Sequence, residues 1–451
     1  MAKMQAWKSI SGAIFALCFC SQFTHAANIY TSTLLVDCSG AGAPGWFTSI
    51  SDALPFATTG TYIFVKPGTT CHEDVFIDHL TTVALTTSLP ETFNLVGRLA
   101  VGESRAVYIG GMNQTGSGSD GINVSHSDDV IFDSCSSSSN PGNGIAAAGS
   151  STVSVEGSGV YNFNGRSGLF AGENSTLWVF AWNSTPIDIS NNIVSAISVD
   201  RSVLVHLGNT TMNNSQLATG ATFPSAFAID ERGGAKAELF GIFGPIMIAS
   251  NQGGGVSLME TSEISIGGSL SWAPYPVTIQ GNGPFGVYEE FASQLTLFGG
   301  VQIFDHSTAG IDIYGNSQAA IYNGTSQIMH NGFGLDPGRA GIRVDGGSQA
   351  YIRMANIAQN GGPGVLGLVN SSLDIAGSNF NSNAGGAVAC DGSSVLIADL
   401  PSGVLGSSNN CKIPAFSGVR RALSTTFSVP DWKRQKAAAD KMHALASTLH
   451  F

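Results

Sequence analysis

The sequence contains few charged residues. Only 11% of its 451 residues are Asp, Glu, Lys or Arg, whereas about a quarter is typical of globular domains. The 19 Lys and Arg residues are outnumbered by 31 Asp and Glu residues, which gives a net charge of −12. With so little basic surface, neither nucleic acid nor an anionic membrane surface is expected as a partner.

Long hydrophobic runs are missing beyond the first residues. Residues 1–26 place Lys3 and Lys8 before the apolar run GAIFALCFC and end in the small-residue tract THA, which predicts a signal peptide. No later segment reaches the roughly 18 apolar residues that a membrane span requires. The mature chain is therefore expected to be secreted, extracellular or periplasmic, and to be a soluble monomer without a transmembrane segment.

Cysteine is also scarce. Of seven cysteines, Cys18 and Cys20 lie in the leader, which leaves Cys38, Cys71, Cys135, Cys390 and Cys411. Because export permits disulfides and the first and last pairs are close in sequence, Cys38–Cys71 and Cys390–Cys411 are the predicted bridges, with Cys135 left over. The alternative is five buried thiols that serve as small apolar side chains.

A repeat dominates the remaining sequence. Ten tracts of the form small–apolar–x–apolar begin 22 to 31 residues apart, at Gly144, Gly168, Ala196, Ala226, Gly255, Gly286, Gly310, Gly341, Gly364 and Gly386. A second tract follows each at a nearly fixed offset and begins with Ser in nine cases, at Ser151, Ser175, Ser202, Ser262, Ser293, Ser317, Ser348, Ser371 and Ser393, with Ala235 as the exception. A third short tract tends to end in Asn-Gly or a similar pair.

Alternation with period two predicts half-buried strands, and three strands per period predict the coils of a parallel β-helix. The Ser and Asn residues would then form columns at the corners, where their side chains can satisfy backbone groups. About ten coils are expected between residues 144 and 400. An antiparallel sandwich or propeller is the competing fold, but it predicts no fixed column of Ser.

On these repeats the chain resembles the right-handed single-stranded parallel β-helix proteins of the pectate-lyase-like, or pectin-lyase-fold, superfamily, over about residues 30 to 400. The segment GAPGWFTSISDALPFATTGTYIFVKPGTTCHEDVFI is similar to the start of pectin-methylesterase-like chains. The resemblance implies an all-β fold with an N-terminal capping helix at about Phe47–Phe56 and a strand-turn at Val65–Thr69. It also implies a carbohydrate-active function, with the catalytic residues on the first strand of each coil.

The end of the chain has a different composition. The glycine-rich pattern stops at about Pro414, and residues 430–449 are expected to form an amphipathic helix that covers the last coil or docks on the flank. A partner-binding or peripheral membrane helix is the alternative. The expected organisation is a signal peptide (1–26), an N-terminal cap with the first coils (27–100), the β-helix (101–412), and a linker with the C-terminal helix (413–451).

Candidate functional residues follow from the first tract. With its small residue as position zero, positions one and three point inward and positions two and four point outward. Position two holds Phe170, Ser198, Ala228, Ser257, Tyr288, Asp312, Arg343 and Leu366; position four holds Gly172, Asp200, Asp230, Met259, Glu290, Tyr314, Asp345 and Leu368. The predicted catalytic residues are Asp200, Asp230, Glu290, Asp312, Arg343 and Asp345, and the predicted substrate-binding residues are Tyr288, Tyr314 and Arg232. Glu231 and Glu289 lie beside them in sequence.

Adjacent coils lie about 4.8 Å apart, so Asp200 is expected next to Asp230 and Asp312 next to Arg343. Two close carboxylates can keep one group protonated as a general acid while the other acts as base or nucleophile. No cofactor is evident, although the carboxylates could instead hold Ca²⁺, and Arg343 could act in a lyase as base or as a clamp on a uronate. The alternative interpretation is a set of acids that serve solubility and turn formation.

Two functions are compatible with this pattern. The first is an exported carbohydrate-active enzyme, a polysaccharide lyase, glycoside hydrolase or epimerase that acts through carboxylates on one sheet face. The second is a non-catalytic extracellular adhesin or structural solenoid that binds a polysaccharide or cell-surface glycan, which the lack of polygalacturonase and classical pectate-lyase signature motifs favours.

Overall fold

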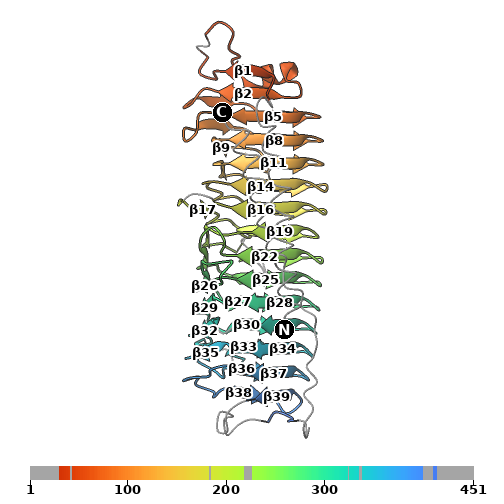
Figure 1. The fold of residues 1–451 in the computed structure, drawn as a ribbon, viewed down its shortest axis with the longest axis vertical. Helices are drawn as coiled ribbons and strands as arrows, with labels where there is room; N and C mark the ends of the chain where they lie inside the picture. Colours follow the sequence, from red (N-terminus) through yellow and green to blue (C-terminus); the bar gives the residue numbers. More distant parts are fainter. Residues whose placement is uncertain are drawn as a thin grey trace, which may run out of the picture.

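A computed structural model describes residues 30–40, 43–181, 184–217, 226–322, 325–334, 338–399 and 410–413. The predicted signal peptide and C-terminal helix lie outside these residues. In the described part, parallel strands stack in long sheets along one axis, from the first strands at one end to the last at the other (Figure 1). The parallel β-helix predicted from the repeat is confirmed.

Each complete coil contributes one strand to each of three faces. Strand β30, for example, belongs to the 13-stranded sheet, β31 to the 15-stranded sheet and β32 to the 7-stranded sheet, and each pairs with the equivalent strand one coil away. The return path of each coil supplies the crossover that parallel pairing requires.

The 13-stranded sheet contains the predicted first tracts. Its strands are β4 (Val75–Asp78), β7 (Leu99–Gly102), β10 (Ile122–Ser125), β13 (Ile145–Ala148), β15 (Leu169–Gly172), β18 (Ile197–Asp200), β21 (Phe227–Arg232), β24 (Gly254–Leu258), β27 (Phe285–Glu289), β30 (Ala309–Ile313), β33 (Ala340–Val344), β36 (Val365–Gly367) and β38 (Val388–Cys390). The ten strands from β13 onward are the ten predicted tracts, and β4, β7 and β10 continue the sheet towards the N-terminus.

The 15-stranded sheet contains the second tracts. Its strands are β1 (Ser32–Val36), β2 (Thr61–Val65), β5 (Thr81–Thr86), β8 (Arg105–Gly110), β11 (Asp128–Asp133), β14 (Thr152–Glu156), β16 (Thr176–Phe180), β19 (Val203–His206), β22 (Lys236–Phe240), β25 (Glu263–Gly267), β28 (Gln294–Phe298), β31 (Gln318–Ile321), β34 (Gln349–Arg353), β37 (Ser372–Ala376) and β39 (Val395–Asp399).

The third face is divided between two sheets. The 4-stranded sheet is formed by β3 (Thr70–His72), β6 (Phe93–Val96), β9 (Met112–Thr115) and β12 (Ser136–Ser138). The 7-stranded sheet is formed by β17 (Ile187–Asp188), β20 (Thr210–Asn213), β23 (Ile246–Ala249), β26 (Val277–Gln280), β29 (Val301–Phe304), β32 (Gln327–Met329) and β35 (Asn356–Ala358).

The interior is one continuous apolar core of inward-facing Ile, Val and Leu side chains from all three faces. At the corner before the 15-stranded sheet, a column of buried serines links successive coils, as predicted. The Ser151 backbone N–H donates to Ser175 Oγ at 3.1 Å, and the Ser175 N–H donates to Ser202 Oγ at 3.2 Å. These bonds satisfy corner backbone groups that the strand ladders leave open.

The N-terminal end of the core carries the predicted cap in a shorter form. Helix α2 (Ile50–Ala53) continues into a 3₁₀ turn at Leu54–Phe56, and Ile50 and Ala53 are fully buried in the core. The Glu73 carboxylate accepts hydrogen bonds from the Ile50 and Ser51 backbone N–H groups at 2.8 Å, which caps the helix. Without this cover the first coil would expose its apolar interior.

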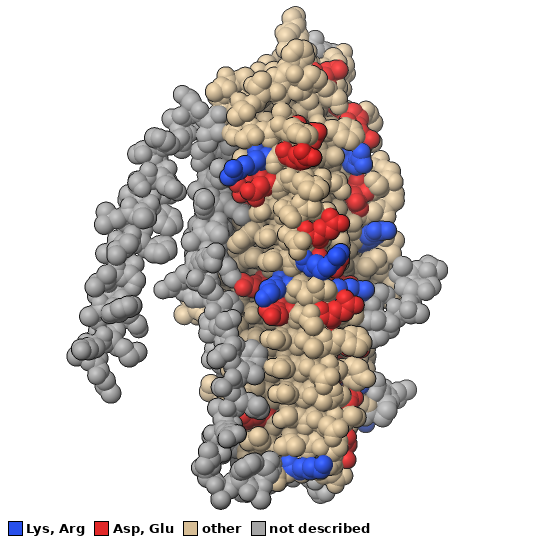
Figure 2. Space-filling model, turned by 90° about the vertical axis from the view of Figure 1, so that its right-hand side faces the viewer, with Lys and Arg blue, Asp and Glu red and all other residues tan. Residues whose placement is uncertain are grey.

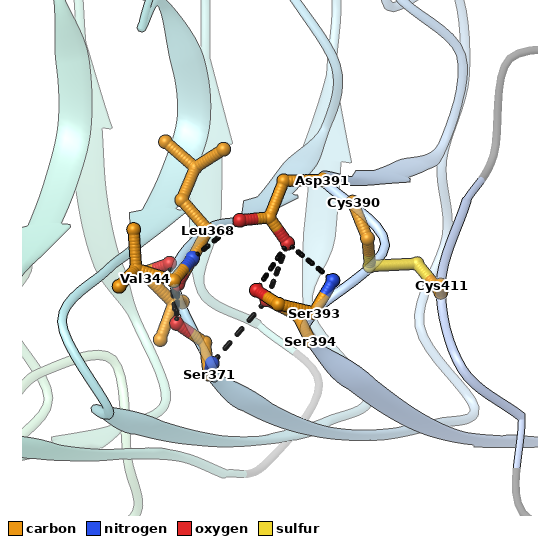
Figure 3. Close-up of a disulfide and its surroundings, with 9 residues drawn as sticks. Val344, Leu368, Ser371, Cys390, Asp391, Ser393, Ser394 and Cys411 are labelled. Carbon is orange, nitrogen blue, oxygen red and sulfur yellow. Dashed lines mark hydrogen bonds between the residues drawn. A yellow bond between two sulfur atoms is a disulfide. The ribbon is translucent and has the colours of Figure 1, made fainter.

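Both expected cysteine pairs are joined: Cys38 to Cys71 near one end of the described coils and Cys390 to Cys411 near the other. Cys135 is free and buried, and burial raises the pKa of its thiol to about 12. Beside the second bridge, Asp391 accepts hydrogen bonds from Ser393 Oγ at 2.7 Å and Ser394 Oγ at 3.2 Å (Figure 3). Although desolvation opposes the change, hydrogen bonds from Val369 and the serines hold the pKa of Asp391 well below its usual range.

The described surface shows no large patch of one charge in the view of Figure 2, where acidic and basic side chains intermingle, chiefly in the upper and middle parts of that flank. Among the described residues, no helix has the length and apolar character needed to cross a membrane.

Candidate functional site

The predicted site lies on the outer face of the 13-stranded sheet, over strands β18 to β33. The parallel register aligns outward residues from coil to coil, so that Tyr288 on β27 lies beside Asp312 on β30, and Asp312 lies beside Arg343 on β33. The expected adjacency of Asp312 and Arg343 is therefore confirmed.

The expected adjacency of Asp200 and Asp230 is wrong. The register places Asp230 beside Ser198 and places Arg232 beside Asp200. The reason is that Ala228, not Ala226, is the small residue aligned with Gly255, because Phe227 pairs with Gly254 and Ile229 with Val256. Asp230 therefore occupies position two rather than position four, and the two-carboxylate arrangement of a glycoside hydrolase is not formed by these residues.

Asp312 and Arg343 form a bidentate ion pair. Arg343 Nε donates to Asp312 Oδ1 at 2.7 Å, and Nη2 donates to Oδ2 at 2.6 Å. The Asp312 side chain is fully buried, whereas 19% of the Arg343 side chain is exposed. The guanidinium also lies over the Phe285 ring, 5.8 Å from its centroid. The two parallel hydrogen bonds hold the Arg343 guanidinium in one orientation and place its positive charge against the Asp312 side chain. The sequence predicts that Asp312 is exposed on the outer face, but its side chain is fully buried.

Tyr288 and Glu290 form a second polar pair beside the first. The Tyr288 hydroxyl donates to Glu290 Oε2 at 2.8 Å. The Tyr288 ring packs against Phe285 and Phe227, with centroid distances of 5.3 Å and 6.2 Å. Burial and the bond to Glu290 raise the pKa of the Tyr288 hydroxyl well above its usual value. Because only 8% of Tyr288 is exposed, its ring offers little surface on which a sugar could stack.

The other predicted residues lie apart from these two pairs. Arg232 Nε donates to Asp230 Oδ2 at 3.0 Å, and burial raises the pKa of Asp230 although the Arg232 charge lowers it. Asp200 pairs with Arg201 at 3.1 Å on the surface. Asp345 accepts a bond from the Gly346 N–H at 2.6 Å, which is a turn contact.

Tyr314 is the predicted substrate-binding ring that stays accessible, with 41% of its surface exposed. It stands over the turn at Gly346, and Phe291, which is 54% exposed, stands over Gly315 one coil earlier. The two rings thus mark the edge of the site at which a sugar ring could stack.

Glu231 and Glu289 point into the core rather than outward. Glu231 aligns with the core residues Val199 and Leu258, and Glu289 aligns with Leu258 and Ile313. Neither oxygen of Glu231 has a hydrogen-bond partner, and Glu289 Oε1 accepts a bond from the Gln318 N–H at 3.2 Å. Burial raises the pKa of both carboxyls well above the usual range. They do not belong to the outer site.

Sequence reasoning missed two features. The first is Phe285, whose ring packs against both Arg343 and Tyr288 and which stands one residue before the small–apolar–x–apolar tract that begins at Gly286. On the 15-stranded sheet, Asp133 and Glu156 align on adjacent coils, with the Tyr108 hydroxyl donating to Asp133 Oδ2 at 3.0 Å. The sequence signal for this pair is the acid that ends each of two successive second tracts, Asp133 and Glu156. Glu156 is 1% exposed, so the pair is closed to a large ligand.

The described residues bring one group of metal-capable side chains together, namely Cys38, Cys71 and Glu73. The two sulfurs form a disulfide and Glu73 caps helix α2, so this group does not suit a metal ion. Among the described residues, the predicted carboxylates do not gather into a calcium-binding cluster.

The fold and this face define a parallel β-helix protein with an acid, Arg and Tyr cluster on one sheet. The sequence matches no protein-family model and no curated protein. Similar solved structures include the A-module of the Azotobacter vinelandii mannuronan C-5 epimerase AlgE6 (12% identity, 78% of this chain and 93% of that chain, TM-score 0.41). They also include an alginate lyase from Paenibacillus (13% identity, 66% of this chain and 95% of that chain, TM-score 0.29). A further one is the Streptococcus pneumoniae surface protein and adhesin PfbA (10% identity, 80% of this chain and 93% of that chain, TM-score 0.29). Matches at this level assign no activity to this chain.

Proposed function

We propose that this protein is an exported carbohydrate-active β-helix protein that acts on an acidic polysaccharide by proton abstraction, as a lyase or an epimerase. The observation that carries the proposal is the Tyr288 hydroxyl bonded to Glu290 beside the Asp312–Arg343 pair. Hydrolysis through two carboxylates is less well supported, because Asp200 and Asp230 are not neighbours.

The roles follow from the geometry. Arg343 provides positive charge next to a site for a uronate carboxylate, and Asp312 fixes its orientation. Tyr288 and Glu290 share one proton, so that one can remove the proton next to the uronate carboxylate while the other returns a proton to the sugar. In a lyase the leaving glycosidic oxygen takes that proton. In an epimerase the pair serves one face of the sugar only, so it removes the proton and water supplies a proton to the same carbon from the opposite face.

A panel of polysaccharides tests the proposal. The intact protein is incubated with uronate-containing and neutral polymers, and unsaturated products are followed by ultraviolet absorbance and epimerised uronates by NMR. Tyr288→Phe, which removes one hydroxyl, is expected to lower the rate by about a hundredfold or more. Tyr275→Phe is the matched control, since that ring is exposed on a different loop. A blank panel, or full activity in Tyr288→Phe, contradicts the proposal.

A non-catalytic glycan-binding solenoid is the second candidate. The observation in its favour is that both Asp312 oxygens are engaged by Arg343 and that Asp312 is fully buried, as in a structural ion pair. Binding of a uronate polymer without any change in its NMR spectrum after prolonged incubation would support this function over the first.

A further inference from the structure

The outer face of the 15-stranded sheet carries a row of aromatic rings that the site described above does not use. We call it the aromatic face. It comprises the rings of Trp178, Phe240, Trp272, Phe298, Tyr322 and Tyr351, together with the carboxyl group of Glu238. The strands of the 15-stranded sheet follow one another along the axis of the molecule, one from each coil (Figure 1).

The rings form a continuous series. The Phe240 centroid is 4.9 Å from that of Trp272 and 6.3 Å from that of Phe298, across Gly267. The series continues from Phe298 to Tyr322 at 6.3 Å, and from Tyr322 to Tyr351 at 5.5 Å. It ends where the Arg353 guanidinium lies 3.8 Å from the Tyr351 ring centroid. Phe240 is fully buried and Phe298 is 6% exposed, and Trp178, Trp272 and Tyr322 pack against the buried cluster that contains them. The accessible part of the face is therefore formed by the half-buried residues Trp178, Trp272, Tyr322 and Tyr351.

Glu238 lies in the same face. The register places it between Val205 and Ser265 on the adjacent coils, and it stands two residues before Phe240 on β22. Its Oε2 atom is buried and has no hydrogen-bond partner, and burial raises the pKa of this carboxyl to about 7. The nearest acid on the adjacent coil, Glu263, is instead paired with Lys236 at 2.9 Å. A buried carboxylate oxygen without a partner in the protein favours a ligand that donates a hydrogen bond to it.

We propose that the aromatic face binds a neutral polysaccharide chain, laid along the axis with its sugar rings against the aromatic rings and its hydroxyls donating to Glu238. Sugar rings stack on aromatic faces through their C–H groups, and Trp272, Tyr322 and Tyr351 offer half-buried rings on this face. A polyuronate is disfavoured here, because its carboxylates would lie against Glu238. This binding face is independent of the proposed function on the 13-stranded sheet.

Binding measurements on the intact protein test this inference. Cellohexaose, mannohexaose and xylohexaose are the neutral probes, a hexauronate is the anionic probe and polylysine is the cationic probe, each titrated by calorimetry. At least one neutral probe is expected to bind and to change the tryptophan fluorescence. Glu238→Gln and Tyr322→Ala are each expected to weaken that binding about tenfold or more.

Three controls make the result decisive. Glu263→Gln, which changes an acid that is paired with Lys236, is expected to bind the neutral probe as the unmodified protein does. Tyr288→Phe, which changes the site on the 13-stranded sheet, is also expected to bind it normally. This second control separates the inference from the proposed function. Circular dichroism and unfolding curves establish that the variants are folded. The inference is overturned if no neutral probe binds, if Glu238→Gln binds as the unmodified protein does, or if polylysine alone binds.

Discussion

At the scale of single residues, the main feature of the outer face of the 13-stranded sheet is the bidentate ion pair between Asp312 and Arg343. A fully buried carboxylate is tolerated because two N–H groups of one guanidinium compensate its charge. Phe285 lies beside the Arg343 guanidinium and belongs, with Tyr288, to a small buried aromatic cluster on this face.

Removal of Arg343 should therefore lower the stability of the folded protein. Arg343→Ala is expected to lower the free energy of unfolding by about 3–5 kcal/mol, because Asp312 would be left buried without its counter-charge. Arg201→Ala is the matched control: its partner Asp200 is exposed on the surface, and the change is expected to cost less than about 1 kcal/mol. Equal losses in urea unfolding would show that Asp312 is not dependent on Arg343.

The interior carboxyl of Glu231 predicts an unusual pH dependence. In the unfolded chain its pKa is about 4.3, but burial and the nearby Asp230 raise the pKa in the folded protein. The folded state thus holds a proton that the unfolded state releases, and stability contributed here is lost as the pH rises above about 4.3. Glu231→Leu, which matches the neighbouring Leu258, is expected to stabilise by about 1–3 kcal/mol at pH 7 and by less at pH 4.

Denaturant unfolding at several pH values measures this effect. Glu263→Leu, at an exposed position, serves as the control and should change stability by less than about 0.5 kcal/mol, apart from its ion pair with Lys236. A gain for Glu231→Leu that does not depend on pH would indicate improved packing alone and would refute the linkage.

Residue positions were the hardest feature to predict from the sequence. The segment AFAIDER contains small residues at both 226 and 228, and alternation with period two fits either as the start of the tract. The two choices place Asp230 in different columns. Glu231 could not be placed inside, because an acid at an inward position contradicts the pattern that defined the strands. Asp312 and Arg343 were placed correctly because GIDIY and GIRVD each offer one small residue in phase.

At the scale of elements, a ladder of buried asparagines runs along a second corner of the coils. The Asn331 backbone N–H donates to Asn360 Oδ1 at 2.9 Å, and Asn331 Nδ2 donates to the Ile303 carbonyl at 3.1 Å. Asn251 and Asn282 repeat this arrangement. His306 interrupts the ladder, although its ring nitrogens reach the Asn282 and Ile279 carbonyls. Burial lowers the pKa of His306 to about 4, so the ring is neutral and can donate to one of the two carbonyls.

Completion of the ladder should stabilise the protein. In His306→Asn, the amide can donate to Ile279 and accept from the Asn282 N–H, as its neighbours do, which is expected to raise the free energy of unfolding by about 1 kcal/mol. Asn331→Ala, which removes the same contacts one coil further on, is expected to lower it by about 1–3 kcal/mol. Thermal unfolding of both variants measures the difference, and a large loss for His306→Asn would contradict the equivalence of these positions.

At the scale of the whole molecule, each coil contacts its neighbours along one axis, so stability should be distributed locally. Loss of the Cys390–Cys411 bridge, in Cys390→Ala with Cys411→Ala, is expected to raise hydrogen–deuterium exchange in β36 to β39 and to leave β14 to β22 unchanged. Mass-spectrometric exchange with peptide resolution distinguishes this result from global loosening, in which the central strands would exchange faster as well.

The overall architecture could be predicted because it depends on a repeated pattern. The Gly tract, the Ser corner and the Asn corner recur so often that an error in one coil leaves the fold unchanged. The site depends instead on single side chains. Tyr288 packs against Phe285 on its own strand and Phe227 two coils away, and Asp312 pairs with Arg343 on the next coil. Contacts between coils depend on which residues of adjacent strands are aligned. The sequence predicts that alignment only where a tract has a single small residue that can be its first position.

The central claim is that Tyr288 and Glu290 exchange a proton with a uronate sugar beside Arg343. The most direct measurement incubates the intact protein with uronate polymers in deuterium oxide and follows the sugar by NMR. The account predicts loss of the proton next to the uronate carboxylate, through deuterium incorporation or formation of an unsaturated sugar, and no such change with Tyr288→Phe. Polymers that bind yet keep every ring proton would contradict it and would favour a glycan-binding scaffold.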